Sequence, residues 1–235
     1  MPDSESLDSI VRILCTVGHE WAASGLRAIA EFGLGALPED VRSANPSLVA
    51  LKGVLLSGSD PESAIAHLES ACQAYRDAEN LPAESMYLHE LAVVAINENR
   101  FDVLRKIRKR MFAVARSGRD TPVRGMLLLG LAGSFLLARR YATSLRFLGA
   151  ASAYDHQPRE MGGIGIVQST ILFYPGKWDE TNRRIEAILA RPEQRKHGGS
   201  YSALRIYQAM IESQRGSDPE TPRERLEEAC EFIRS

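Results

Sequence analysis

Cysteine, excess charge of one sign and long apolar runs are all scarce in this sequence. Its 235 residues include 3 cysteines, Cys15, Cys72 and Cys230, and such few, widely spaced thiols exclude a disulfide framework. No run of about 18 apolar residues occurs, which excludes a membrane-spanning helix. The formal net charge of −1 disfavours a dedicated nucleic-acid-binding protein. We therefore expect a cytoplasmic protein that is not attached to a membrane.

Local motifs for catalysis, metal binding and nucleotide binding are also missing. The sequence has no GxxxxGK[ST] phosphate-binding loop, no GxSxG nucleophile elbow and no CxxC, CxxH or HxxxH pair. The stretch GGIGIV (162–167) lacks the third glycine of a dinucleotide fingerprint, and no strand pattern precedes it. We expect no catalytic residues, no metal and no cofactor. Solitary Ser, Cys and Asp side chains still leave an enzyme on a helical scaffold open as an alternative.

Helical periodicity dominates what is present. No segment alternates apolar and polar residues in the manner of a strand, so no sheet is predicted. Apolar helical stretches precede and follow a series of anchor positions whose spacings are 40, 40, 40, 37 and 41 residues, namely Trp21, Pro61, Phe101, Tyr141, Trp178 and Pro219. Helix–turn–helix units that recur at such a period are typical of α-solenoids.

The clearest copy of the repeat surrounds the turn Gly58-Ser59-Asp60-Pro61. Asp60 is predicted to cap the second helix of this copy, with Pro61 at the first helical position. Gly53 is a small residue at a point where two helices can approach closely. The sequence therefore predicts an all-α fold, an α-solenoid of about six antiparallel helix pairs in one domain over residues 1–235. Residues 1–45 are expected to form a capping pair.

Three stretches resemble a known family. They are GHEWAASGLRAIAEFGLGALPEDVRSANPSLVALKGVLL (18–56), DPESAIAHLESACQAYRDAENLPAES (60–85) and YATSLRFLGAASA (141–153). Together they look like the TPR-like (tetratricopeptide-like) domain of MalT-type regulators, bacterial STAND ATPases that often end in a LuxR-type DNA-binding domain. The bridge ALPEDVR…NPSLVALKG resembles the family's connection between helix pairs. The resemblance covers residues 18–155, and residues 155–235 are less typical of the family.

The resemblance implies a role in transcription regulation. In that family the repeat domain binds an inducer or a partner protein and biases an ATPase switch. This chain would then be a non-enzymatic sensor, either as a segment of a larger regulator or as a stand-alone relative. The alternative is a stand-alone adaptor between proteins, without a small ligand.

In tetratricopeptide-like solenoids the first helix of each pair lines the concave face. Alignment of the repeats places an apolar and aromatic set with scattered polar groups there, which suits a small organic ligand or an amphipathic peptide. The predicted binding residues are Met86, His89, Asn97, Met126, Phe173, Tyr174, Tyr207, Gln214 and Arg215, with Val93 also on this face. Filling of the core between helices is an alternative role for Met126 and Phe173.

Charge is distributed unevenly along the chain. Residues 1–98 carry 5 basic and 15 acidic side chains, whereas residues 99–124 carry 9 basic and 2 acidic ones. The densest basic run is a predicted patch for an acidic partner, formed by Arg105, Lys106, Arg108, Lys109 and Arg110. The alternative is a solvated outer helix that balances the acidic first third, and direct binding of nucleic acid is disfavoured.

Overall fold

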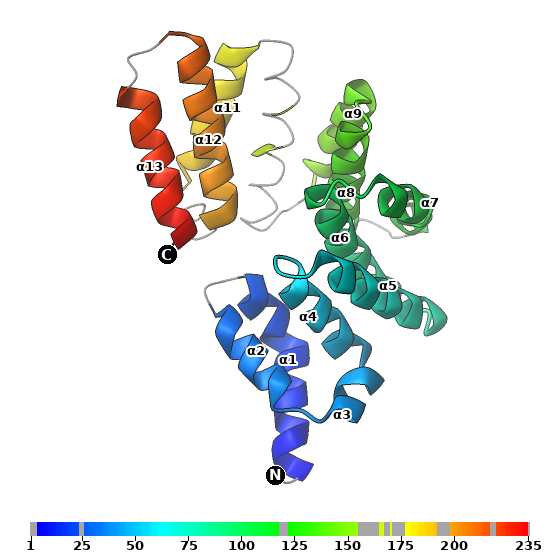
Figure 1. Cartoon of the computed structure of the whole chain (residues 1–235). Coiled ribbons are helices and arrows are strands. Elements are labelled where there is room, and N and C mark those ends of the chain that lie inside the picture. Colours follow the sequence, from blue (N-terminus) through cyan, green and yellow to red (C-terminus); the bar gives the residue numbers. More distant parts are fainter. Residues whose placement is uncertain are drawn as a thin grey trace. The chain divides into compact units, whose positions relative to one another are not determined.

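The computed structural model describes residues 4–23, 26–117, 122–154, 165–166, 170, 177–191, 198–216 and 220–234. All regular secondary structure in these ranges is helical, which confirms the predicted all-α class (Figure 1). Contacts divide the chain into two units, Met1–Arg119 and Asp120–Ser235, and each is described by itself. The predicted solenoid and the single domain stay predictions. None of the described helices is both long and apolar enough to cross a bilayer.

Consecutive helices pack on one another in the first unit. α1 contacts α2 and α4, and the series continues from α4 to α5, from α5 to α6 and from α6 to α7. The elements are α1 (Ser4–Ala23), α2 (Arg27–Gly35), α3 (Glu39–Ala44), α4 (Pro46–Leu56), α5 (Pro61–Asp77), α6 (Leu81–Asn97) and α7 (Phe101–Ser117). The core between α1, α2 and α4 is made of leucine and alanine side chains, Leu14, Ala30, Leu34, Leu37, Leu48, Leu51 and Leu55.

Side-chain caps begin three of these helices. The Asp60 carboxylate accepts the backbone N–H of Ser63 at 3.1 Å, and Pro61 is the first residue of α5, as predicted. Asn45 caps α4 and Asn80 caps α6 in the same way. Each cap satisfies a backbone N–H group that the first helical turn leaves without a partner, which stabilises that helix start.

One turn geometry recurs after α5, α6 and α8. Glu79, Asn99 and Arg139 each have a φ between 52° and 55°, and the following residue donates its N–H five residues back. This is the Schellman arrangement that ends a helix, here built without the usual glycine. The turn at Asn97–Arg100 and the turn at Arg139-Arg140 both lie where the repeat predicts them.

In the first repeat the anchor residue does not begin a helix, whereas it does in the second to fifth repeats. Trp21 lies in the last turns of α1, whereas Pro61, Phe101, Tyr141 and Trp178 each begin a helix. The helix continues past Trp21 because the sequence contains no turn signal before Ser24-Gly25. The short α3 is a further helix that the repeat pattern does not predict.

The second unit contains two sets of helices. In the first set α8 packs on α9, and in the second set α12 packs on both α11 and α13. Their bounds are α8 (Pro122–Leu137), α9 (Tyr141–Ala151), α11 (Trp178–Leu189), α12 (Gly198–Gln214) and α13 (Glu220–Arg234). The core of α11 and α12 is formed by Ile185, Ile188, Leu189, Tyr201, Leu204 and Ile211. The predicted turn Pro175-Gly176 lies outside the described residues.

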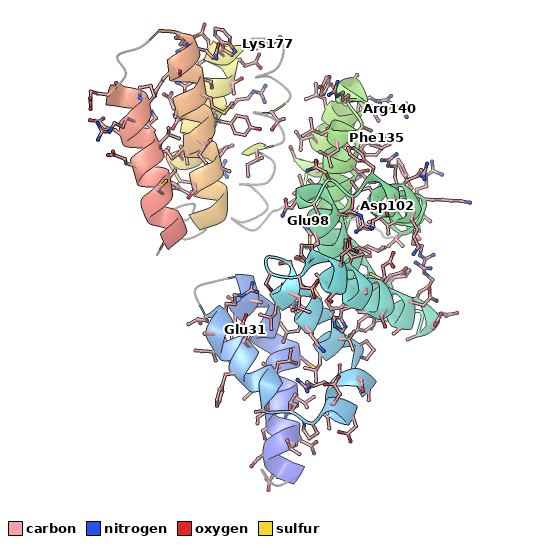
Figure 2. The ribbon with its side chains drawn as sticks, in the orientation of Figure 1. Glu31, Glu98, Asp102, Phe135, Arg140 and Lys177 are labelled. Atoms are coloured by element: carbon pink, nitrogen blue, oxygen red, sulfur yellow. The ribbon has the colours of Figure 1, made fainter. Side chains whose placement is uncertain are left out.

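The α8–α9 pair crosses at a small polar residue. Ser144 is fully buried, and its hydroxyl donates to the carbonyl of Ala132 at 2.6 Å. The rings of Phe135 and Phe147 stack at 5.4 Å between centroids, and the Arg140 guanidinium lies 5.5 Å from the Phe135 ring (Figure 2). A small side chain three residues after the anchor Tyr141 therefore permits close packing of the two helices.

Candidate functional site

One face of α6 carries a stripe of partly exposed side chains. Met86, Glu90 and Val93 are partly exposed and Asn97 is exposed, and these residues follow each other at intervals of four, three and four. That spacing keeps them on one face of a helix. His89 lies off this stripe and is buried, with 6% of its surface exposed. The predicted concave-face residues Met86, Val93 and Asn97 thus form a continuous strip, and His89 belongs to the interior.

The remaining predicted residues of this set belong to the second unit. Met126 is partly buried on α8. The Tyr207 hydroxyl on α12 is 2.5 Å from the Thr170 hydroxyl. Arg215, just after α12, forms an ion pair with Asp179 of α11, and Gln214 is exposed at the end of α12. Phe173 and Tyr174 lie outside the described residues.

The predicted basic patch lies on α7, where the structure separates its members. Lys106 forms an ion pair with Glu69 of α5 at 2.8 Å. Arg110 forms one with Glu84 of α6 at 2.6 Å. Arg105 and Lys109 are exposed, and Arg108 is partly buried. Lys106 and Arg110, which helical spacing places on a different face from Arg105 and Lys109, are thus the two that pair with acidic residues of α5 and α6.

Glu84 is a fully buried ionisable group of the first unit. Its carboxylate has no exposed surface and accepts both Nε and Nη2 of Arg110, at 2.7 and 2.6 Å, and Nε of Arg76 at 3.0 Å. Burial raises the pKa of Glu84, but the hydrogen bonds and charges of Arg110 and Arg76 outweigh burial, so its pKa lies below the usual value. This triad ties α5, α6 and α7 together, and sequence reasoning missed it. The available signal was one acidic residue within an otherwise apolar helix face.

A second polar cluster joins α1, α4, α5 and α6. The Ser47 and Tyr75 hydroxyls are 2.5 Å apart, and the Tyr75 and Tyr87 rings stack at 5.4 Å. The Tyr87 hydroxyl is 3.1 Å from Nε2 of His19. Asn45 donates to the sulfur of Cys15 at 3.6 Å. These bonds satisfy polar groups at the helix junction, so the cluster positions α1 against α4 and α6.

The thiols near this region do not have the character of nucleophiles. Burial raises the pKa of Cys15, although hydrogen bonds from Ser47 and Asn45 oppose the shift. Burial also raises the pKa of Cys72 to about 12. Because the thiolate is the reactive form, the raised pKa makes both thiols less reactive at neutral pH than an ordinary cysteine. Among the described residues, no three or more His, Cys, Asp or Glu side chains form a group that could hold a metal ion.

Thiol labelling should distinguish Cys230 from Cys72. We expect exposed Cys230 to react fully with a thiol-specific reagent in the folded protein, while Cys72, 3% exposed, stays unmodified. Brief labelling at neutral pH followed by peptide mass spectrometry measures both. Unfolded protein, in which all three react, is the control. Labelling of Cys72 in the folded protein at the rate seen in the unfolded protein would contradict the assignment.

No model of a known protein family matches the chain. A search of curated proteins likewise finds no match.

Proposed function

We propose that this chain is a non-enzymatic regulatory binding module of the MalT-type sensor kind, working in the cytoplasm in transcription control. It would recognise a small-molecule inducer or a partner segment. The observation that supports this proposal is the stripe of α6, on which Met86, Val93 and Asn97 combine a flexible thioether, an apolar group and an amide beside the carboxyl group of Glu90. Such a mixture fits a ligand with an apolar body and few polar groups.

Binding along α6 would act through the helices that α6 contacts. α6 packs on both α5 and α7, and the Glu84 triad links all three. A ligand that prefers one arrangement of these helices would shift the population toward it, and a coupled output would sense the change. In this proposal the triad makes α5, α6 and α7 respond as one unit.

The α6 stripe can be tested with a charged substitution on it. We expect Val93→Asp to abolish retention of a small bound mass when the protein is recovered gently from its host and examined by native mass spectrometry. Ile29→Asp, at a half-exposed position of α2, is the matched control and should keep that mass. A ligand bound equally by both variants, or no ligand on the wild-type protein, would contradict the proposal.

A second candidate function is an adaptor that docks an acidic protein through residues 100–124. The exposed cations of α7 favour it, because two members of the predicted patch, Arg105 and Lys109, point charge toward solvent. Contacts between exposed charges weaken as salt rises. A complex that survives at low ionic strength and dissociates at high ionic strength would support the adaptor. A salt-insensitive complex would count against it.

A further inference from the structure

Ion pairs within the first unit already engage three cations of the basic segment. Arg100 binds both Glu62 and Asp102, Lys106 binds Glu69, and Arg110 binds Glu84. These partners come from α5, α6 and α7 itself. Part of the negative charge of the first third of the chain is therefore balanced by ion pairs inside the unit. This agrees with the alternative in which the basic segment is an outer helix that balances that charge.

Three further cations on α7 have no such partner. Arg105, Lys109 and Arg116 are exposed, and none of them forms an ion pair with an acidic residue in the described part of the chain. Their spacings are four and seven residues, which at 100° per residue places them within about 40° of one another around the helix. At 1.5 Å per residue they extend over about 16 Å of its length. Figure 2 shows side chains with nitrogen atoms extending outward from α7 near Asp102.

An exposed aromatic side chain continues this row. Phe101, the first residue of α7, is 52% exposed and lies one turn before Arg105. Its angular position also falls on the side of the helix that carries the three cations. We define the outer face of α7 as Phe101, Arg105, Lys109 and Arg116. It combines three positive charges with one apolar contact point.

We propose that the outer face of α7 docks an acidic helical segment of a partner protein. This inference rests on the adaptor function and specifies its site. A helix with carboxylates spaced by four and seven residues matches the three cations, and an apolar side chain one turn further contacts Phe101. Lys106 and Arg110 take no part in docking, because they lie at least about 60° further around the helix than the three cations and face Glu69 and Glu84.

Charge around the outer face favours a polypeptide over nucleic acid. Asp102 on α7 and Glu62 on α5 are both largely exposed, with 59% and 78% of their side-chain surface accessible. A duplex carries one phosphate charge for about every 1.7 Å of its axis, so its continuous negative surface would meet these carboxylates. A peptide helix presents only a few carboxylates and can place neutral residues opposite Asp102 and Glu62.

The test uses fluorescence anisotropy with the full chain and a labelled synthetic peptide. The peptide is alanine-rich, with glutamates spaced by four and seven residues and one leucine a turn further. We expect Arg105→Glu/Lys109→Glu to weaken its binding by about tenfold or more, and binding to weaken with salt. Arg12→Glu/Lys52→Glu, with the same change of net charge, and Lys106→Gln, on the same helix, should each change affinity less than about twofold.

The outcomes distinguish failure of the docking site on α7 from failure of the adaptor function. Equal losses in the outer-face variant and the Lys106→Gln control would overturn the site but leave an adaptor that docks elsewhere. Failure of the wild-type chain to bind the glutamate peptide more tightly than its glutamine counterpart would overturn the adaptor as well. Stronger competition by a duplex DNA oligonucleotide than by unlabelled peptide would overturn the choice of an acidic polypeptide. Circular dichroism of every variant verifies that it is folded.

Discussion

Replacing Glu84 with glutamine is expected to lower the free energy of unfolding by about 3 kcal/mol. The carboxylate has no exposed surface and is the common partner of Arg76 and Arg110. Its loss leaves two guanidinium groups with a neutral amide that can accept fewer of their hydrogen bonds. Urea denaturation at neutral pH, followed by circular dichroism, measures the change.

The matched control is Glu69→Gln. This residue also pairs with a cation of α7, but its partner Lys106 is 70% exposed, so the cost should stay below about 1 kcal/mol. Because the pKa of Glu84 is lowered in the folded protein, its contribution is present above the unfolded pKa of about 4.3 and disappears as pH falls through the folded value. The difference between wild type and Glu84→Gln should therefore shrink in acid. Equal costs for both variants would show that the triad contributes no more than a surface pair.

Replacing Gly53 with a larger residue is expected to lower the free energy of unfolding by about as much as Glu84→Gln does. A Cβ atom at this position would lie 2.9 Å from Cγ of Leu68 and 3.0 Å from the backbone oxygen of Ala64. The close approach of α4 and α5 that the sequence predicted here is therefore confirmed. Backbone of α5 cannot move away without repacking the helix pair, so Gly53→Leu should cost about 3 kcal/mol. Thermal and urea unfolding of the variant measure this cost.

Gly149 supplies the control, because it lies within α9 and no atom would approach an added Cβ within 4 Å. Gly149→Ala should raise stability by up to about 1 kcal/mol, since alanine is the better helix former. Gly53→Ala gains the same helical preference but meets α5, and should be destabilising. If both alanine variants stabilise the protein, the packing at Gly53 is looser than these distances indicate.

Local chemistry explains why the helices could be predicted. Asp60 and Pro61 form a cap and a first turn from neighbouring residues alone, and the apolar spacing of α5 follows from the sequence next to them. The end of α1 was harder to place, because Trp21 follows the anchor pattern while the chain lacks a breaker at that point. An anchor residue indicates packing, and a breaker decides where the helix ends.

The helix faces that carry the candidate site residues were predictable. Spacing alone placed Met86, Val93 and Asn97 on one side of a helix, and they do lie on one partly exposed stripe. Spacing did not separate them from His89, whose burial depends on neighbouring helices. On α7, helical spacing already places Lys106 on a different face from Arg105 and Lys109. The structure adds that Lys106 forms an ion pair with Glu69 of α5.

The sequence by itself determined the all-helical class, the recurring turns and the close approach of two helices at Gly53, because each depends on residues near one another in the chain. The tertiary structure decided which charges are used internally. Glu84 meets Arg110 across 26 residues, and Glu62 meets Arg100 across 38. Such pairs depend on how helices are placed in space, and no local pattern encodes that placement. Which cations of α7 pair with acidic residues of α5 and α6 is therefore a property of the fold.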